Sequence, residues 1–259
     1  MSPVHRSTLV ERLRTAGCVF AEEEADLLLA AAGEPEAVAA LTERRIAGEP
    51  LEHVLGWAEF CGRRVLVDRG VFVPRARTAW VVETAVAVTG PASAVADLCC
   101  GSGATTVVLA ERLAPRWLAA VDLDPAAVAC ARRNLAGWGV PVLVGDLFAP
   151  LPQAWRGRLD LVVANAPYVP TAAVATLSPE ARLHEARLAL DGGPDGLSVL
   201  RRVAADAARW LAPGGHLVVE VAADQAGPLC TVLRGYGLDP AVRHDVDRDA
   251  TAVVAGRRP

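Results

Sequence analysis

The fold of this chain is decided by the stretch Ala94-Val95-Ala96-Asp97-Leu98-Cys99-Cys100-Gly101-Ser102-Gly103. Its first five residues are apolar apart from Asp97, which is typical of a buried parallel strand. Small residues then lead directly into a helical pattern, and glycines at such a turn let a ligand approach the backbone. Cys99 stands where a dinucleotide-binding fingerprint has its first glycine, so on these residues alone a plain strand-to-helix turn stays an open alternative.

Around this stretch, apolar segments alternate with amphipathic ones. The alternation predicts an α/β fold, in which helices cover both faces of a doubly wound, mostly parallel sheet. The last two strands predict an antiparallel edge and bring the sheet to seven strands. The predicted strands are 94–98, 117–121, 141–144, 159–164, 216–221, 241–245 and 251–255, and the predicted helices are 78–88, 104–114, 125–137, 197–212 and 225–235.

The first 47 residues contain three short helical segments instead. Ser7 is the predicted N-cap of the first, the second spans about 21–32, and the third begins near Pro35. Three short helices are too small to fold alone. We therefore expect residues 1–47 to form a helical domain that docks onto a larger part of the chain, followed by a β-hairpin linker over 48–74 and a large domain over 75–259.

The composition excludes several functional classes. Arginine supplies all 26 basic residues, which excludes a lysine Schiff base and the usual pyridoxal-phosphate chemistry. A net charge of −4 argues against direct binding of nucleic acid. The six cysteines form no C-x-x-C pair and predict no metal site. Neither a signal peptide nor a membrane-spanning segment is recognisable, so we expect a cytoplasmic protein without a membrane partner.

Acidic residues stand at the ends of three predicted strands, at Asp97, Asp122 and Asp146. In doubly wound folds the carboxyl ends of the strands meet where ligands bind. Asp122 follows the glycines by about 20 residues, a spacing at which a carboxylate can accept both hydroxyls of a ribose. Asp146 can bind an adenine amino group while Leu147 covers the ring. Each acid alone is more often a helix cap, as we expect for Asp124, but three together favour a nucleoside site.

The predicted strand 159–164 is followed by Asn165-Ala166-Pro167-Tyr168. The side-chain oxygen of Asn165 and the carbonyl of Ala166 can both accept hydrogen bonds from a planar NH2 group, and Tyr168 offers a flat apolar surface. Such a site suits methyl transfer to an amide or an exocyclic amine, if a methyl donor binds nearby. Without that donor, Asn-x-Pro is more often a plain turn.

These residues resemble the class I S-adenosylmethionine-dependent methyltransferases, which have a Rossmann-like fold, and more narrowly the release factor (protein) glutamine N-methyltransferases of the HemK/PrmC type. The resemblance covers nearly the whole chain, and it implies that residues 1–47 are a substrate-recognition domain and residues 75–259 the methyltransferase domain. It implies an enzyme that transfers a methyl group from S-adenosyl-L-methionine to the glutamine amide in the Gly-Gly-Gln loop of peptide-chain release factors, with S-adenosyl-L-homocysteine as product. The narrower motifs are Gly48-Glu49-Pro50, His53, Gly56, Glu59-Phe60, Gly62, Val71-Phe72-Val73-Pro74-Arg75, Asp191-Gly192-Gly193 and Asp195-Gly196-Leu197.

The resemblance also implies roles for individual residues. Asn165 and the carbonyl of Ala166 would bind the glutamine amide, and Phe72, Pro167 and Tyr168 would wall its pocket. The ribose would bind to Asp122. The implied cofactor-binding residues are Asp97, Cys99, Cys100, Gly101, Ser102, Gly103, Asp122, Asp146, Leu147 and Asn165.

Three positions depart from the pattern of this family. Ala166 replaces the first proline of Asn-Pro-Pro-Tyr, Ala76-Arg77-Thr78-Ala79 lacks two acidic residues, and Ala186 replaces a proline. The changes leave open a diverged enzyme acting on a small molecule or another protein. An adenine amino-methyltransferase and an inactive S-adenosylmethionine-binding adaptor are further alternatives, although the retained Asn165, Tyr168 and strand-end acids argue against the last.

Methyl transfer from a sulfonium needs positioning more than acid or base catalysis. We therefore predict no general base, and we expect His184 to be a solvated loop residue. Arg201, Arg202 and Arg209 share one predicted helix, where we expect a solvated charged face rather than a binding surface.

Overall fold

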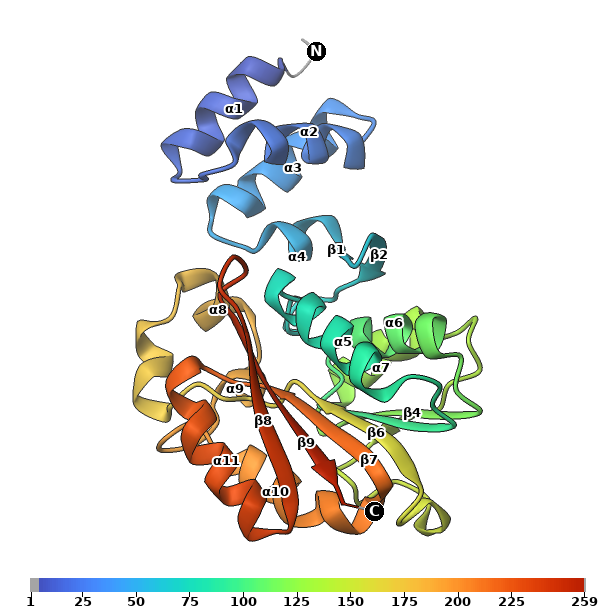
Figure 1. The fold of residues 1–259 in the computed structure, drawn as a ribbon. Helices are drawn as coiled ribbons and strands as arrows, with labels where there is room; N and C mark the ends of the chain where they lie inside the picture. The colour runs from blue at the N-terminus through green and yellow to red at the C-terminus, as the bar shows by residue number, and fades with distance from the viewer. Residues whose placement is uncertain (1–4, 259) are drawn as a thin grey trace.

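The computed structural model describes residues 5–258, and its main sheet has seven strands: β3 (Ala94–Leu98), β4 (Trp117–Asp122), β5 (Val142–Val144), β6 (Leu159–Ala164), β7 (Leu211–Glu220), β8 (Leu238–Asp245) and β9 (Ala250–Arg257). Their order is β5-β4-β3-β6-β7-β9-β8. The first five in this order are parallel, and β9 pairs antiparallel with β7 and β8. The predicted doubly wound, Rossmann-like sheet is confirmed (Figure 1).

The sheet is flanked by α5 (Ala76–Thr89), α6 (Ala104–Leu113), α7 (Pro125–Asn134), α10 (Ser198–Trp210) and α11 (Ala226–Gly235), with short 3-10 helices η1 (Gln153–Trp155) and η3 (Ala223–Gln225). Side chains of the central strands alternate between two hydrophobic cores. On β6, Val162 and Ala164 join the core that contains α10 and α11, whereas Leu161 and Val163 join the core that contains α5, α6 and α7. Both faces are buried, which explains why these strands are mostly apolar.

The strand order reverses between β3 and β6. From β3 the chain runs outward through β4 to β5, and it then returns to place β6 on the other side of β3. Ligands of doubly wound sheets bind at such a switch point, outside the carboxyl ends of the strands. The turn that follows β3 and the loop that follows β6 leave the sheet as neighbours, and both carry motifs predicted from the sequence.

A separate helical unit, with its own hydrophobic core, lies above the sheet in Figure 1 and contains α1 (Arg6–Thr15), α2 (Ala21–Ala31), α3 (Pro35–Ile46) and α4 (Leu51–Leu55). α1 begins after His5, so the prediction of Ser7 as its N-cap is wrong. Residues 1–4 of the predicted domain 1–47, and residue 259 of the predicted domain 75–259, lie outside the described residues. Among the described helices, none is long and apolar enough to cross a membrane.

The hairpin expected within residues 48–74 is formed by β1 (Trp57–Phe60) and β2 (Arg63–Leu66), which pair antiparallel. Its Phe60 and Val65 are buried in the core with α5. α4, which precedes the hairpin, has only five residues, too few to show helical periodicity in the sequence. The His53 ring of α4 lies with Nε2 2.8 Å from the carbonyl oxygen of Val71, which ties this helix to the chain entering α5.

Between β6 and α10, the chain folds into η2 (Thr171–Thr176), α8 (Pro179–His184) and α9 (Arg187–Leu190). The sequence predicts none of these, because each has six residues or fewer. Two contacts fasten this segment to the N-terminal part of the chain. Glu180 accepts a hydrogen bond of 2.6 Å from Arg45 of α3, and buried Glu185 accepts one of 3.2 Å from the backbone N–H of Val73. The segment therefore links the helical unit to the edge of the sheet where ligands bind.

Candidate active site

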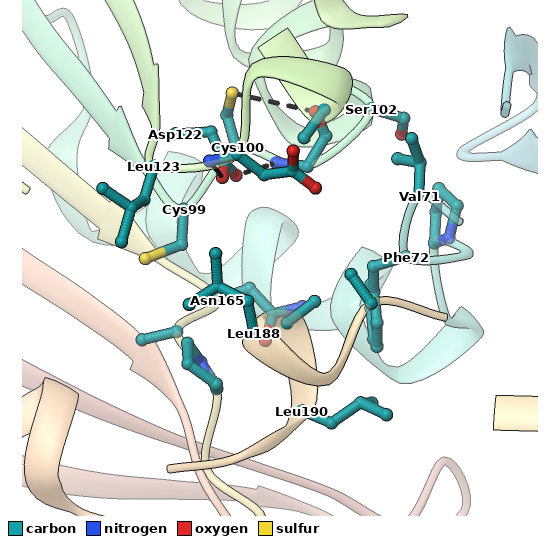
Figure 2. Close-up of a pocket in the computed structure, with 18 of the residues that line it drawn as sticks. Val71, Phe72, Cys99, Cys100, Ser102, Asp122, Leu123, Asn165, Leu188 and Leu190 are labelled. Atoms are coloured by element: carbon teal, nitrogen blue, oxygen red, sulfur yellow. Dashed lines mark hydrogen bonds between the residues drawn. The ribbon is translucent and has the colours of Figure 1, made fainter. Parts of the chain in front are cut away.

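A cavity of about 420 Å³ lies at the carboxyl ends of the parallel strands. Figure 2 shows Asp122 and Cys100 on one side of it, with Phe72, Asn165 and Leu188 across from them. The structure thus brings the predicted donor and acceptor sites into one space. The predicted site residues that line the cavity are Phe72, Asp97, Cys99, Cys100, Gly101, Ser102, Asp122, Asp146, Leu147, Asn165, Ala166, Pro167 and Tyr168.

Gly103 is the predicted site residue that does not line the cavity. A Cβ on Gly103 would lie 3.0 Å from the Cβ of Ala131, so glycine here permits close packing of the turn on α7. Gly101 does face open space, since a Cβ there would meet no atom within 4 Å. Cys99 adopts a left-handed backbone with φ +56°, a conformation that favours glycine. This strain lies at the site, where such backbone strain is commonly found.

Asp97 and Asp122, near the carboxyl ends of β3 and β4, are buried to different degrees. Asp122 accepts hydrogen bonds from the backbone N–H groups of Gly101, at 2.8 Å, and Asp124, at 2.9 Å. Burial raises the pKa of Asp122, and these N–H groups oppose the rise. Asp97 is fully buried and accepts a bond of 2.5 Å from the Thr106 hydroxyl; burial raises the pKa of Asp97 to about 7. Asp124 caps α7, as predicted.

At the end of β5, Asp146 forms an ion pair with Arg202 of α10, and both side chains line the cavity. Leu147 is buried beside them with a left-handed backbone, φ +49°. The other two arginines of the predicted charged face pair with acids away from the cavity, Arg201 with Asp195 and Arg209 with Asp206. The ion pair between Asp146 and Arg202, which brings Arg202 to the cavity, was therefore not predicted from the sequence.

The loop after β6 is held by a buried carboxylate at the end of β7. Glu220 accepts a hydrogen bond of 2.9 Å from the Tyr168 hydroxyl and one of 2.6 Å from the Thr78 hydroxyl. Arg77 donates a third, of 2.9 Å. The Asn165 Nδ2 atom lies 3.4 Å from the Thr78 hydroxyl oxygen. Burial, together with the charge of Glu220, raises the pKa of Tyr168, so the phenol stays neutral at physiological pH.

A second loop holds the backbone of Tyr168. The Gln225 side-chain NH2 donates to the carbonyl oxygens of Tyr168, at 2.8 Å, and of Asp195, at 3.1 Å. A Cβ on Gly196 would lie only 2.1 Å from the Tyr168 oxygen, so this position requires glycine. The motif Asp195-Gly196-Leu197 therefore packs directly on the Asn165–Tyr168 loop and restrains it.

Several residues of the site were not predicted as such, among them Thr78, Glu220 and Arg202. Glu220 had a usable signal, because it is an acid at the carboxyl end of the predicted strand 216–221, as Asp122 is of its own strand. Thr78 and Arg202 lie on helices and have no comparable signal. His184, expected to be a solvated loop residue, is instead the half-buried last residue of α8, and it is not among the residues that line the cavity.

The doubly wound sheet, with a small-residue turn, strand-end acids and Asn-x-Pro-Tyr at one switch point, defines a Rossmann-like methyltransferase. A family described as "Methyltransferase domain" matches residues 95–184. The ribosomal protein L11 methylase of Lactobacillus delbrueckii subsp. bulgaricus has the same fold, with 16% identity, a TM-score of 0.55 and coverage of 74% of this chain and 84% of that one. The T. thermophilus 16S rRNA N2 G1207 methyltransferase, solved with AdoMet and guanosine, shows 20% identity, a TM-score of 0.56 and coverage of 78% and 50%.

Curated relatives narrow the class. The release factor glutamine methyltransferase of Geobacter sulfurreducens is 43% identical over 86% of this chain and 79% of its own length. The protein of the same name from Bradyrhizobium diazoefficiens is 35% identical over 97% of this chain and 90% of its own length. The chain belongs to the release factor glutamine methyltransferase family, as its motifs predicted.

Proposed function

We propose that this methyltransferase uses S-adenosyl-L-methionine to methylate the side-chain amide nitrogen of glutamine in the Gly-Gly-Gln loop of a peptide-chain release factor. The names of its relatives support this acceptor. One structural observation carries the proposal. Asn165 and Ala166, which together offer a pair of hydrogen-bond acceptors suited to an NH2 group, line the same cavity as the small-residue turn and Asp122. Figure 2 shows Asn165 across the cavity from Asp122.

The residues around the turn fit a bound S-adenosylmethionine. Gly101 leaves open space where a side chain would otherwise stand. Each oxygen of the Asp122 carboxylate already accepts one backbone N–H and retains a lone pair for a ribose hydroxyl. Asp146, Leu147 and Cys99 line the same cavity, where the first two would contact the adenine and Cys99 the methionine part. When bound, S-adenosylmethionine supplies an electrophilic methyl group on a sulfonium.

The acceptor side of the cavity compensates for a poor nucleophile. An amide nitrogen reacts slowly because its lone pair is delocalised into the carbonyl. Hydrogen bonds to Asn165 and to the Ala166 carbonyl orient the NH2 group and stabilise positive charge that develops on its nitrogen. Phe72 and Tyr168 confine the amide plane. Such positioning lowers the barrier by up to about 7–11 kcal/mol. The new N–C bond forms as the S–C bond breaks, and the proton then leaves to water.

The test is transfer of labelled methyl from S-adenosylmethionine to a purified release factor, beside a copy whose loop reads Gly-Gly-Ala. We expect label on the Gly-Gly-Gln protein alone. Asn165→Ala is expected to lower kcat by about 10²–10³-fold, the usual effect of removing one preorganised polar group. Label on the Gly-Gly-Ala copy, or full turnover by Asn165→Ala, contradicts the proposal. Donor binding without any label points to a different acceptor.

A further inference from the structure

The carboxylate of Glu220 lies where three parts of the chain meet: the loop Asn165–Tyr168, called the acceptor loop below, the start of α5 and the end of β7. The residue is 1% exposed, and its carboxylate accepts hydrogen bonds from Arg77, Thr78 and Tyr168. Arg77 Nε and the Tyr168 hydroxyl share Oε1, which leaves Oε2 for Thr78. A buried carboxylate can only accept hydrogen bonds, so it fixes the direction in which each of its three donors points its hydrogen. This fixed direction extends to the acceptor loop.

The fixed direction passes from Glu220 to Asn165 through Thr78. The ion pair with Arg77 holds Glu220 as a carboxylate, which can only accept hydrogen bonds. The single hydroxyl hydrogen of Thr78 therefore points to Glu220, and only lone pairs of the Thr78 oxygen remain for Asn165. At 3.4 Å from that oxygen, the Asn165 amide must turn its NH2 group toward Thr78. Its oxygen Oδ1 then points away from Thr78 and is left to accept a hydrogen bond from a ligand.

This assignment does not depend on which side-chain atom was drawn as nitrogen. An asparagine amide has nearly the same shape when it is flipped, so its hydrogen-bond network decides the orientation. Among the described residues, Asn165 makes no side-chain hydrogen bond other than the one to Thr78. Thr78 is 5% exposed, so water competes little for its hydroxyl oxygen. Thr78 is thus the contact that chooses between the two orientations.

We propose that Thr78 and Glu220 are positioning residues that orient the Asn165 amide, so that its oxygen and not its NH2 group faces the methyl acceptor. This inference rests on the proposed function and adds a basis for specificity. An oxygen at this point accepts a hydrogen bond from a glutamine NH2 group, whereas it repels the carboxylate of a glutamate. The flipped amide would have the opposite preference.

Glu220→Gln should reverse the direction of the hydrogen bonds that run between residue 220, Thr78 and Asn165, without changing the shape of the side chain. These hydrogen bonds are called the relay below. Arg77 can only donate, so the glutamine oxygen stays with Arg77 and the glutamine NH2 group faces Thr78. Thr78 then accepts this hydrogen bond and donates its own hydrogen to Asn165, whose amide flips. Thr78→Val removes the relay altogether and leaves either orientation open, and Thr78→Ser restores the hydroxyl.

The experiment measures kcat and KM for release factor, donor affinity, and the ratio of affinities for Gly-Gly-Gln and Gly-Gly-Glu copies of the release factor. We expect a wild-type preference for glutamine, its loss or inversion in Glu220→Gln, its loss in Thr78→Val, and its recovery in Thr78→Ser. The kcat/KM should fall about a hundredfold in Glu220→Gln and in Thr78→Val, while donor affinity stays within about twofold of the wild-type value.

A structural role alone would lower activity without moving the preference for glutamine. An unchanged preference in both Glu220→Gln and Thr78→Val therefore overturns the positioning role, whatever happens to turnover. If Glu220→Gln fails to fold, Thr78→Val still decides, because it lacks only the hydroxyl group. Wild-type enzyme that transfers no methyl to release factor overturns the proposed function, and this inference with it.

Discussion

Replacing Gly196 by alanine should displace the acceptor loop. Gly196 has φ +77°, and an added Cβ would lie 2.1 Å from the Tyr168 carbonyl oxygen and 2.3 Å from the Gln225 Nε2 atom. The left-handed backbone costs alanine about 1–2 kcal/mol. Relief of the overlap adds about 1–3 kcal/mol, and loss of the Gln225 hydrogen bond about 1 kcal/mol. We therefore expect Gly196→Ala to lower the free energy of unfolding by about 3–6 kcal/mol.

Gly214→Ala is the matched control. Its φ of +78° is nearly the same, but a Cβ at Gly214 would meet no atom within 4 Å, so only the backbone cost of about 1–2 kcal/mol applies. Urea unfolding of the two variants separates strain from overlap. Methyl transfer, measured where both variants are folded, should fall about a hundredfold in Gly196→Ala alone, as expected for a shift of about 1 Å in a catalytic loop. Equal loss of stability, or wild-type turnover in Gly196→Ala, refutes the reasoning.

Three further changes test other parts of the structure. Arg45→Met leaves Glu24 buried without its partner and should lower the free energy of unfolding in urea by about 3–5 kcal/mol. Arg12→Met breaks an exposed pair and should lower it by less than about 1 kcal/mol. Equal losses in the two variants would contradict the buried pairing. Burial raises the pKa of Asp97 to about 7 from an ordinary 3.8, so the folded state keeps a proton that the unfolded state loses. Wild-type stability should therefore fall as pH rises from about 4 to 7, by up to about 4 kcal/mol relative to Asp97→Asn. Parallel pH profiles of the two proteins would count against this. Cys99→Gly relieves a φ of +56° and should raise the unfolding free energy by about 0.5–1 kcal/mol, net of the entropy of glycine, and a lower thermal midpoint would argue against strain there.

The sheet and the cavity-lining residues at its strand ends could be predicted from the sequence because they depend on local patterns. Apolar runs bounded by turns mark buried strands, and acids or small residues at strand ends fall at one edge once the strands are parallel. Asp122 and Asn165 were found in this way. The pattern does not reach helices of four to six residues, so α4, α8 and α9 emerged only from the structure.

The hydrogen-bond network around Glu220 could not be predicted from the sequence, for a different reason. Thr78 and Glu220 are separated by 142 residues, and their contact depends on how α5 docks beside β7. A threonine in the first turn of a helix is ordinarily unremarkable, and only the 2.6 Å bond to a buried carboxylate distinguishes it. Periodicity can place both residues near one edge of the sheet, but it cannot say which side-chain atoms meet.

The departures from the family pattern look different once their neighbours are known. Ala166 loses the rigidity of a proline, yet it is 1% exposed and the Gln225 bond to the Tyr168 carbonyl restrains the loop from outside. Arg77, which stands where the family has an acid, pairs with Glu220, so its charge is offset within the site. Neither substitution therefore removes Asn165 or the Ala166 carbonyl, the two groups that the proposed function assigns to the amide acceptor. On this argument, the two changes give no reason to expect an acceptor other than glutamine.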